Sequence, residues 1–257
     1  MATVNFQAPR LGKGVKFLLI SLVSVLVLQN AFSKFGNYPV ESVFGFSPVD
    51  FLSGYIWQIV TYPFLHGGLF HALFNALFIY MLGSEFERRW GTAKFLKYYF
   101  ACALGAAVLQ LIVWFLGFYF YPEFAERLGK TPIIGASGAI YGLFVAFGLV
   151  FGETHVLLFF VLPMKAKHFV AIITFIALFS AVFYTDDKAG GGIAHLVHLG
   201  GLITGFIYLR IMGPNLTGGG RGGKSKMTQQ EIRRRLSLVV NNEEDRKGDT
   251  GMPITWN

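Results

Sequence analysis

Long runs of apolar residues without charge recur along the chain and predict membrane-spanning helices. A helix needs roughly 20 apolar residues to cross a bilayer core, because each residue rises about 1.5 Å and lipid cannot satisfy open backbone groups. Six runs meet this requirement, over residues 17–33, about 65–84, 98–122, 131–152, 168–185 and 189–209. The pattern therefore predicts an all-α fold, a polytopic membrane bundle with a six-transmembrane core.

Three apolar stretches need a separate interpretation. The charge-free interval 51–84 is too long for one helix and contains Pro63, Gly67 and Gly68, so we expect its first part to be a loop. The run 156–162 is too short to cross and ends at Pro163, which favours an interfacial segment leading into the fifth helix. The first run lacks a small-residue cleavage site, so we expect it to stay on the protein rather than act as a signal peptide.

Composition narrows the class of protein. Of the 257 residues, 54% are hydrophobic and only 14% are charged, whereas soluble domains carry roughly a quarter charged residues. A soluble enzyme, a disordered chain and a coiled coil are therefore disfavoured, and the lipid bilayer is the expected surrounding. The single cysteine, Cys102, excludes an internal disulfide and a cysteine-built zinc site. The net charge of +8 does not predict a nucleic-acid partner, because the basic residues lie beside apolar segments.

The basic residues predict the orientation of the chain. Lysine and arginine are more frequent before the first helix, after the second, between the fourth and fifth, and after the sixth. We expect both termini to be cytoplasmic, in a multi-pass protein of the plasma (inner) membrane. The predicted domains are a cytoplasmic N-terminal segment (1–16), the six-helix domain (17–212) and a flexible basic cytoplasmic tail (213–257). The tail opens with a glycine-rich linker, and residues 228–240 are compatible with a short helix.

A few strongly polar residues lie at membrane depth, where each costs several kcal/mol unless it is paired or reaches water. They fall into three sets, in the second, fourth and sixth helices. The sets are His66, His71 and Asn75; Ser137 within Gly135–Gly138; and His195 with His198. All three lie near extracytoplasmic helix ends, at a depth of roughly 8 to 12 Å when helical rise is counted from Pro63, Pro132 and Gly192. These side chains are therefore expected to share one layer.

The three sets contain what acyl transfer requires: a nucleophile, a base and hydrogen-bond donors for an oxyanion. Ser137 is the candidate nucleophile. His195 and His198 compete for the role of base, and the spacing from His198 to Gly201 and Gly205 favours His198. The predicted spans contain no aspartate or glutamate, so a Ser-His dyad is expected rather than a triad.

Glycines explain how the serine and the histidine could meet. Gly138 and Gly142 are four residues apart on the fourth helix, as are Gly201 and Gly205 on the sixth. Paired small residues let helix backbones approach closely in lipid. Gly135 would permit a tight turn before Ser137 and leave backbone N–H groups open at the helix start.

At this point the pattern resembles the rhomboid intramembrane serine proteases, over about residues 15–212. The resemblance rests on a GxSG motif, an HxxGxxxG motif and a set of second-helix residues. These are Gly135, Ser137 and Gly138 with Tyr141; His198, Gly201 and Gly205; and His66, His71, Asn75, Gly83, Glu87 and Gly91. One departure is Gln58 after Trp57, where many members have arginine.

The resemblance implies a role for each matched residue. Ser137 would be the nucleophile and His198 the general base. His71, Asn75 and the Ser137 N–H would stabilise the oxyanion, and Tyr141 would pack against the His198 ring. The substrates would be single-span membrane proteins, cut without a metal or other cofactor.

Other interpretations stay open. An inactive rhomboid-like protein that binds membrane helices is the main alternative. A transporter or channel would show paired intramembrane charges and an inverted repeat, and the sequence shows neither. A metalloprotease could use His66, His71, His195 and His198 as ligands, but the sequence contains no HExxH motif and no carboxylate within the predicted spans. The aromatic residues of the first loop, Phe44, Phe46, Phe51, Tyr55 and Trp57, fit either interfacial burial or packing on helix ends. Glu85, Glu87, Arg88 and Arg89 most simply form a charged cytoplasmic cap.

Overall fold

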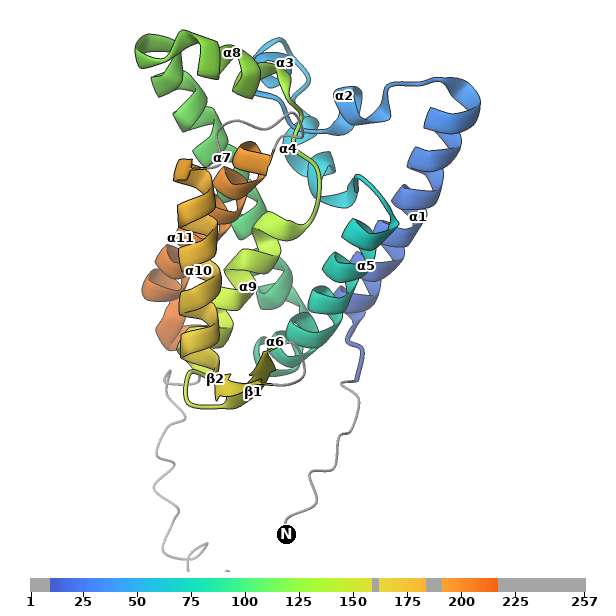
Figure 1. Cartoon of the computed structure of the whole chain (residues 1–257). Helices are drawn as coiled ribbons and strands as arrows, with labels where there is room; N and C mark the ends of the chain where they lie inside the picture. The colour runs from blue at the N-terminus through green and yellow to red at the C-terminus, as the bar shows by residue number, and fades with distance from the viewer. Residues whose placement is uncertain (1–9, 159–161, 184–190, 217–257) are drawn as a thin grey trace, which may run out of the picture. The chain divides into compact units, whose positions relative to one another are not determined.

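The computed structural model describes residues 10–158, 162–183 and 191–216, and nearly all of its elements are helices (Figure 1). The elements are α1 (Lys13–Gly36), α2 (Val40–Phe44), α3 (Pro48–Leu52), α4 (Gln58–Thr61), η1 (Tyr62–Phe64), α5 (Leu69–Phe78), η2 (Ile79–Gly83), α6 (Ser84–Trp90), α7 (Thr92–Phe120), α8 (Pro122–Lys130), α9 (Ser137–Val150), β1 (His155–Leu158), β2 (Leu162–Lys165), α10 (Ala166–Phe183) and α11 (Gly191–Leu216). The expected helix at 228–240 lies outside the described residues.

A helix stands at each of the six predicted spans, and the expected all-α membrane bundle is confirmed. Among the described residues, four stretches are long and apolar enough to cross a membrane: Lys13–Gly36, Leu69–Trp90, Thr92–Phe120 and His195–Met212. The apolar helices Ser137–Val150 and Ala166–Ser180 are shorter. In the second span, α5, η2 and α6 follow one another without a break, and η2 is a π-helical segment. The domain division at residues 16 and 212 stays a prediction.

Several boundaries differ from the prediction. The fourth helix begins at Ser137 rather than at 131, because the preceding residues are extended: Ile133 and Phe46 exchange two backbone hydrogen bonds, of 2.8 and 3.0 Å. The depth estimates for Ser137 and His71, which counted helical rise from Pro132 and Pro63, are therefore wrong, because α9 begins at Ser137 and α5 at Leu69. The second helix starts at Leu69, after Gly68. α7 starts earlier than predicted because Lys94 and Lys97 lie in its first turns, where long cationic side chains reach water from a helix end.

Several elements outside the six spans were not predicted: the short helices α2, α3, α4 and η1, where the sequence predicts only a loop, together with α8, β1 and β2. α8 follows α7 directly and, with the short helices α2 to α4, gathers at one end of the bundle (Figure 1). Of the run 156–162, expected as an interfacial segment, the described residues 156–158 and 162 belong to the antiparallel strands β1 and β2 at the opposite end, in which His155 lies opposite Lys165. Hydrogen bonds from Lys165 and Lys167 lower the pKa of Glu153 beside these strands to about 2, so its carboxylate stays ionised at neutral pH.

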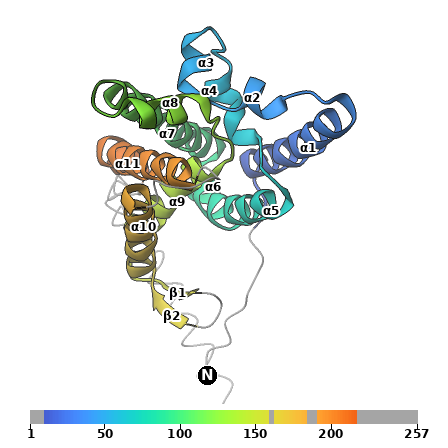
Figure 2. The ribbon, with the colours of Figure 1, turned by 45° about the horizontal axis from the view of Figure 1, so that its top comes forward.

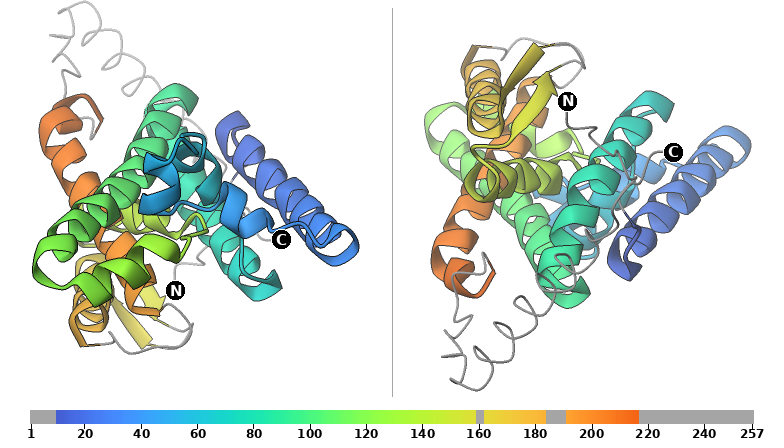
Figure 3. Two further views of the ribbon diagram at one scale, coloured as in Figure 1. Left: turned by 90° about the horizontal axis from the view of Figure 1, so that it is seen from above. Right: turned by 90° about the horizontal axis from the view of Figure 1, so that it is seen from below.

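α9 and α11 pack against each other through glycine. A methyl group at Gly201 would overlap the carbonyl oxygen of Gly138, and one at Gly205 would lie 2.9 Å from the Cα of Gly142. Lipid offers no hydrophobic drive for helix association, so the van der Waals contacts of such closely packed backbones contribute to holding the helices together. α11 also packs against α7 and α10, while α1 lies at the far edge of the bundle (Figures 2 and 3).

The N-terminus of α1 is held by a buried carboxylate. The backbone N–H groups of Gly14 and Val15 donate to the two oxygens of Glu87, at 2.7 and 2.8 Å, and the Thr92 hydroxyl adds a third bond of 2.6 Å. The residues expected to form one charged cytoplasmic cap therefore have two different roles. Glu85 pairs with Arg88 and Arg89 at the surface, whereas Glu87 is only 5% exposed and caps another helix.

Hydrogen bonds from Gln58, the position that departs from the family pattern, connect two parts of the first loop. The Gln58 side chain is fully buried; its oxygen accepts from the Ser47 N–H at 3.1 Å, and its amide nitrogen donates to the Ser42 carbonyl at 3.1 Å. Of the five loop aromatics, Phe46 is buried, while Phe44, Tyr55 and Trp57 are exposed. Packing and surface exposure therefore both occur in this loop.

Candidate active site

The side chains of Ser137 and His198 meet although 61 residues separate them in the chain. The Ser137 Oγ and the His198 Nε2 lie 2.9 Å apart. Ser137 is the first residue of α9, and His198 lies in the first half of α11, so the glycine contact between these helices sets the distance. Both residues are half-buried. The arrangement allows the imidazole to accept the hydroxyl proton of the serine.

The His198 ring is oriented by stacking. The Tyr141 ring, one turn along α9 from Ser137, lies parallel to it, with centroids 4.1 Å apart and an 8° angle between the planes. The His198 Nδ1 has no hydrogen-bond partner within the described residues. The described part of the site thus contains no carboxylate that orients the base. The ring of His195 contacts the His198 ring edge-on, with centroids 5.7 Å apart.

The N-terminus of α9 is suited to bind a negatively charged oxygen. Gly135 has φ +110°, a conformation open chiefly to glycine, and the chain turns there from the extended segment into the helix. The first N–H groups of a helix lack intrahelical acceptors and lie at the positive end of the helix dipole. The backbone N–H groups next to the Ser137 Oγ are therefore suited to an anionic oxygen.

Side chains of α5 face this turn. A Cβ at Gly135 would lie 2.8 Å from the Cε1 and Nε2 of His71 and 3.6 Å from the Nδ2 of Asn75. Asn75 is 6% exposed, and its Nδ2 has no hydrogen-bond partner in the part of the chain that the structure describes. A buried donor without an acceptor is costly, so this amide is free to donate a hydrogen bond to an oxygen placed beside Gly135.

Two residues that support the site were not identified from the sequence. The Tyr62 carbonyl accepts the Gly135 N–H at 2.9 Å, while its hydroxyl donates to the Ala103 carbonyl at 2.6 Å, which joins the turn to α7. The Gln29 side chain of α1 binds the backbone of His66, five residues before His71. The contacting residues are 41 and 37 positions apart in the sequence. A single sequence contains no pattern that predicts contacts at such separations.

The remaining histidines have other surroundings. The His66 ring meets the His71 ring edge-on at 5.0 Å between centroids. His155 lies in β1 and His168 near the start of α10. Across residues 10–158, 162–183 and 191–216, no group of three or more His, Cys, Asp or Glu side chains is arranged to hold a metal ion.

Comparison with known proteins gives one family. A model of the rhomboid domain matches residues 53–215. The chain is 29% identical over 153 residues to "Rhomboid-like protease 1" of Toxoplasma gondii, which covers 60% of this chain and 46% of that protein. It is 26% identical over 151 residues to "Rhomboid protein 1, mitochondrial" of Saccharomyces cerevisiae, covering 59% of this chain and 40% of that protein. It is 30% identical over 195 residues to "Putative rhomboid protease YdcA" of Bacillus subtilis, covering 71% and 83%.

The chain thus spans less than half the length of the first two relatives and most of the third. The match to the family model covers well over half of the chain, and it includes all three polar sets that form the candidate site. By these matches, the chain is a multi-pass membrane protein that belongs to the rhomboid family.

Proposed function

We propose that the chain is an intramembrane serine endopeptidase that hydrolyses peptide bonds of membrane proteins in or near their transmembrane segments. The observation that carries the proposal is the 2.9 Å contact between the Ser137 Oγ and the His198 Nε2. A neutral imidazole at this distance can activate a serine hydroxyl without a metal. Membership of a family whose relatives include named proteases supports the same activity.

In the proposed reaction, the Ser137 Oγ attacks the carbonyl carbon of the scissile bond while the His198 Nε2 takes the hydroxyl proton. Collapse of the tetrahedral intermediate breaks the C–N bond, and His198 returns the proton to the leaving amine. Water then attacks the acyl-enzyme, with His198 again as base, and releases the carboxylic acid and free Ser137. The stacked Tyr141 ring keeps the imidazole in the plane that this proton transfer needs.

The negative oxygen of the intermediate would be stabilised by donors from two helices. The Ser137 N–H comes from α9, and the His71 Nε2 and Asn75 Nδ2 come from α5, on the other side of Gly135. Donors fixed in a site of low dielectric are worth more than donors in water because they need no reorganisation.

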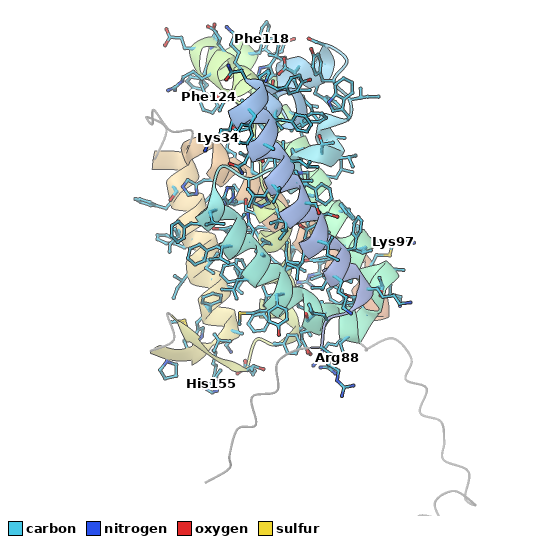
Figure 4. The ribbon with its side chains drawn as sticks, turned by 90° about the vertical axis from the view of Figure 1, so that its right-hand side faces the viewer. Lys34, Arg88, Lys97, Phe118, Phe124 and His155 are labelled. Atoms are coloured by element: carbon cyan, nitrogen blue, oxygen red, sulfur yellow. The ribbon has the colours of Figure 1, made fainter. Side chains whose placement is uncertain are left out.

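We further propose that the substrates are single-span membrane proteins, cut near the extracytoplasmic surface. Arg88 lies at the lower end of the bundle in Figure 4 and Lys97 in its lower half, whereas Phe118 and Phe124 lie at the upper end and Lys34 below them. The excess of lysine and arginine favours the lower end as the cytoplasmic one, with both termini on that side of a plasma or inner membrane.

A fluorophosphonate tests the dyad directly. The reagent should phosphonylate Ser137, because only a serine activated by a base attacks phosphorus rapidly. Labelling should fall at least about 100-fold in His198→Ala and stay unchanged in His168→Ala, a histidine on α10 outside the site. Mass spectrometry of tryptic peptides identifies the labelled residue. Labelling at another serine, or labelling that does not depend on His198, would contradict the proposal.

Replacing Asn75 with alanine should lower kcat while the helices stay folded. Loss of one oxyanion donor costs roughly 100- to 1,000-fold in kcat in serine proteases. The Asn75 Nδ2 has no described partner to lose, so the melting temperature should change little. Cleavage of a purified single-span reporter in detergent measures kcat and KM, and circular dichroism measures the melting temperature. A normal kcat would remove Asn75 from the oxyanion site.

A further inference from the structure

Gln29 is a buried amide of α1, preceded by the apolar run Val25–Leu28. Its side chain is 6% exposed, and its contacts reach two segments outside α1. The Oε1 accepts from the His66 N–H at 3.1 Å, and the Nε2 donates to the His66 carbonyl at 3.0 Å and to the Glu41 Oε1 at 2.9 Å. The amide therefore pairs with the backbone of His66 on both sides, and both of its own N–H groups are used.

This pairing fixes the chain just before α5. With both its N–H and its carbonyl held by Gln29, the backbone of His66 cannot rotate without breaking two buried hydrogen bonds. The next N–H, that of Gly67, donates to the His71 Nδ1, at 3.4 Å between nitrogens. Gly67 has no side chain to restrain it, so its orientation depends on its neighbours.

The contact at Nδ1 determines the hydrogen-bonding role of the other ring nitrogen. A neutral imidazole that accepts at Nδ1 carries its proton on Nε2. The His71 Nε2 faces Gly135, two residues before Ser137. A neutral His71 ring can donate a hydrogen bond from Nε2 to an oxyanion only in this tautomer. With the proton on Nδ1 instead, Nε2 would be an acceptor and would repel the negative oxygen.

We propose that Gln29 is a positioning residue for the oxyanion site: through the His66 backbone and the Gly67 N–H, it holds His71 as the tautomer that donates from Nε2. The kinetic part of this inference rests on the proposed protease function. The structural part, the state of the His71 ring, does not. A helix at the edge of the bundle would then contribute to catalysis without touching the substrate.

The kinetic test uses Gln29→Met, which keeps the length of the side chain and removes its hydrogen bonds. We expect kcat for a single-span reporter to fall about 10- to 100-fold, with KM within about 2-fold, since only donation to the transition state is lost. The matched control is Asn30→Leu, because Asn30 is exposed and its amide donates to the Leu26 carbonyl of its own helix. The control should cleave like the original chain.

A double-mutant cycle separates positioning from general stability. If Gln29 acts through His71, Gln29→Met should change kcat less than about 2-fold in a His71→Ala background, because the group it positions is gone. A role in folding alone would give the same factor in both backgrounds and would overturn the proposal. Gln29→Leu, which also removes the hydrogen-bonding groups and brings no charge near Glu41, should give the same loss of kcat and serves if Gln29→Met does not fold.

Nitrogen NMR of ¹⁵N-histidine-labelled protein in micelles reads the tautomer without any substrate. The resonances lost in His71→Ala identify this ring. In the original chain we expect a protonated Nε2 and an unprotonated Nδ1, and in Gln29→Met a shift of both resonances towards the tautomer average. An unchanged His71 spectrum in Gln29→Met would overturn the inference even if the chain is a protease. The expected shift in a chain without proteolytic activity would contradict the proposed function and leave the positioning of His71 intact.

Discussion

Replacing Ser137 with alanine is expected to abolish peptide cleavage and to leave the fold intact. The substitution removes the Oγ that lies 2.9 Å from the His198 Nε2. It adds no volume at the tight contact between α9 and α11. Loss of the nucleophile in a serine protease costs roughly 10⁶-fold in kcat, so activity should fall at least about 10⁴-fold, to the detection limit. Cleavage of a reporter by the purified chain, followed by gel and mass spectrometry, measures the effect.

A control variant and a binding measurement show whether the loss of cleavage is specific to the nucleophile. Ser24→Ala removes a hydroxyl from an exposed position of α1 and should leave cleavage unchanged. Binding of an uncleaved single-span client should persist in Ser137→Ala, because the residues that surround the client are still present. If the unmodified chain binds clients and never cuts them, the chain is an inactive membrane-helix-binding protein and the protease proposal fails.

Replacing Glu87 with glutamine is expected to destabilise the bundle strongly. The carboxylate accepts from two backbone N–H groups of α1 and from the Thr92 hydroxyl. An amide has one acceptor oxygen, so at least one buried N–H at the start of α1 would face another N–H. Breaking such a buried charged network costs roughly 2 to 4 kcal/mol, equivalent to ~5 to 15 °C in melting temperature for a chain of this size. Thermal unfolding in detergent, followed by circular dichroism, tests this.

Glu85→Gln is the matched control, since it makes the same chemical change two residues away. Glu85 pairs with Arg88 and Arg89 at the surface, and exposed ion pairs contribute little to stability. Its melting temperature should therefore stay close to that of the original chain. Equal losses in the two variants would show that net charge, rather than the cap on α1, determines the stability.

The positions of the helices could be predicted because the bilayer imposes a local rule. Any charge-free run of sufficient length must bond its backbone within itself, and a helix stands at each of the six predicted runs. The rule does not apply outside the membrane. It could not predict α8, the strands after α9 or the extended pairing of Phe46 with Ile133, which delays the start of α9 to Ser137.

The candidate site was predictable for a related reason. Serine, histidine and asparagine stand out where polarity is expensive, and glycine spacing indicated that α9 and α11 touch. The structure places Ser137, His198, Tyr141, His71, Asn75 and Gly135 close together; their catalytic roles stay a prediction. Three residues with a structural role were not predicted correctly: Gln29 and Tyr62 were not identified, and Glu87 was assigned to a charged cap at the surface. Each acts on a partner 37 or more residues away, and amides, phenols and surface-like carboxylates have no spacing that identifies such a partner.

The π-helical segment η2 has a consequence for how the second span evolves. It lies between α5, which carries His71 and Asn75, and α6, which carries Glu87. A π turn accommodates one residue more than an α turn, and one residue corresponds to about 100° of rotation around the helix axis. Deleting a single residue here would therefore let the segment become a regular α-helix, with the inward faces of α5 and α6 still directed at their neighbours. A deletion within α5 or α6 has no such turn to absorb it, and we expect it to disrupt the packing of that helix.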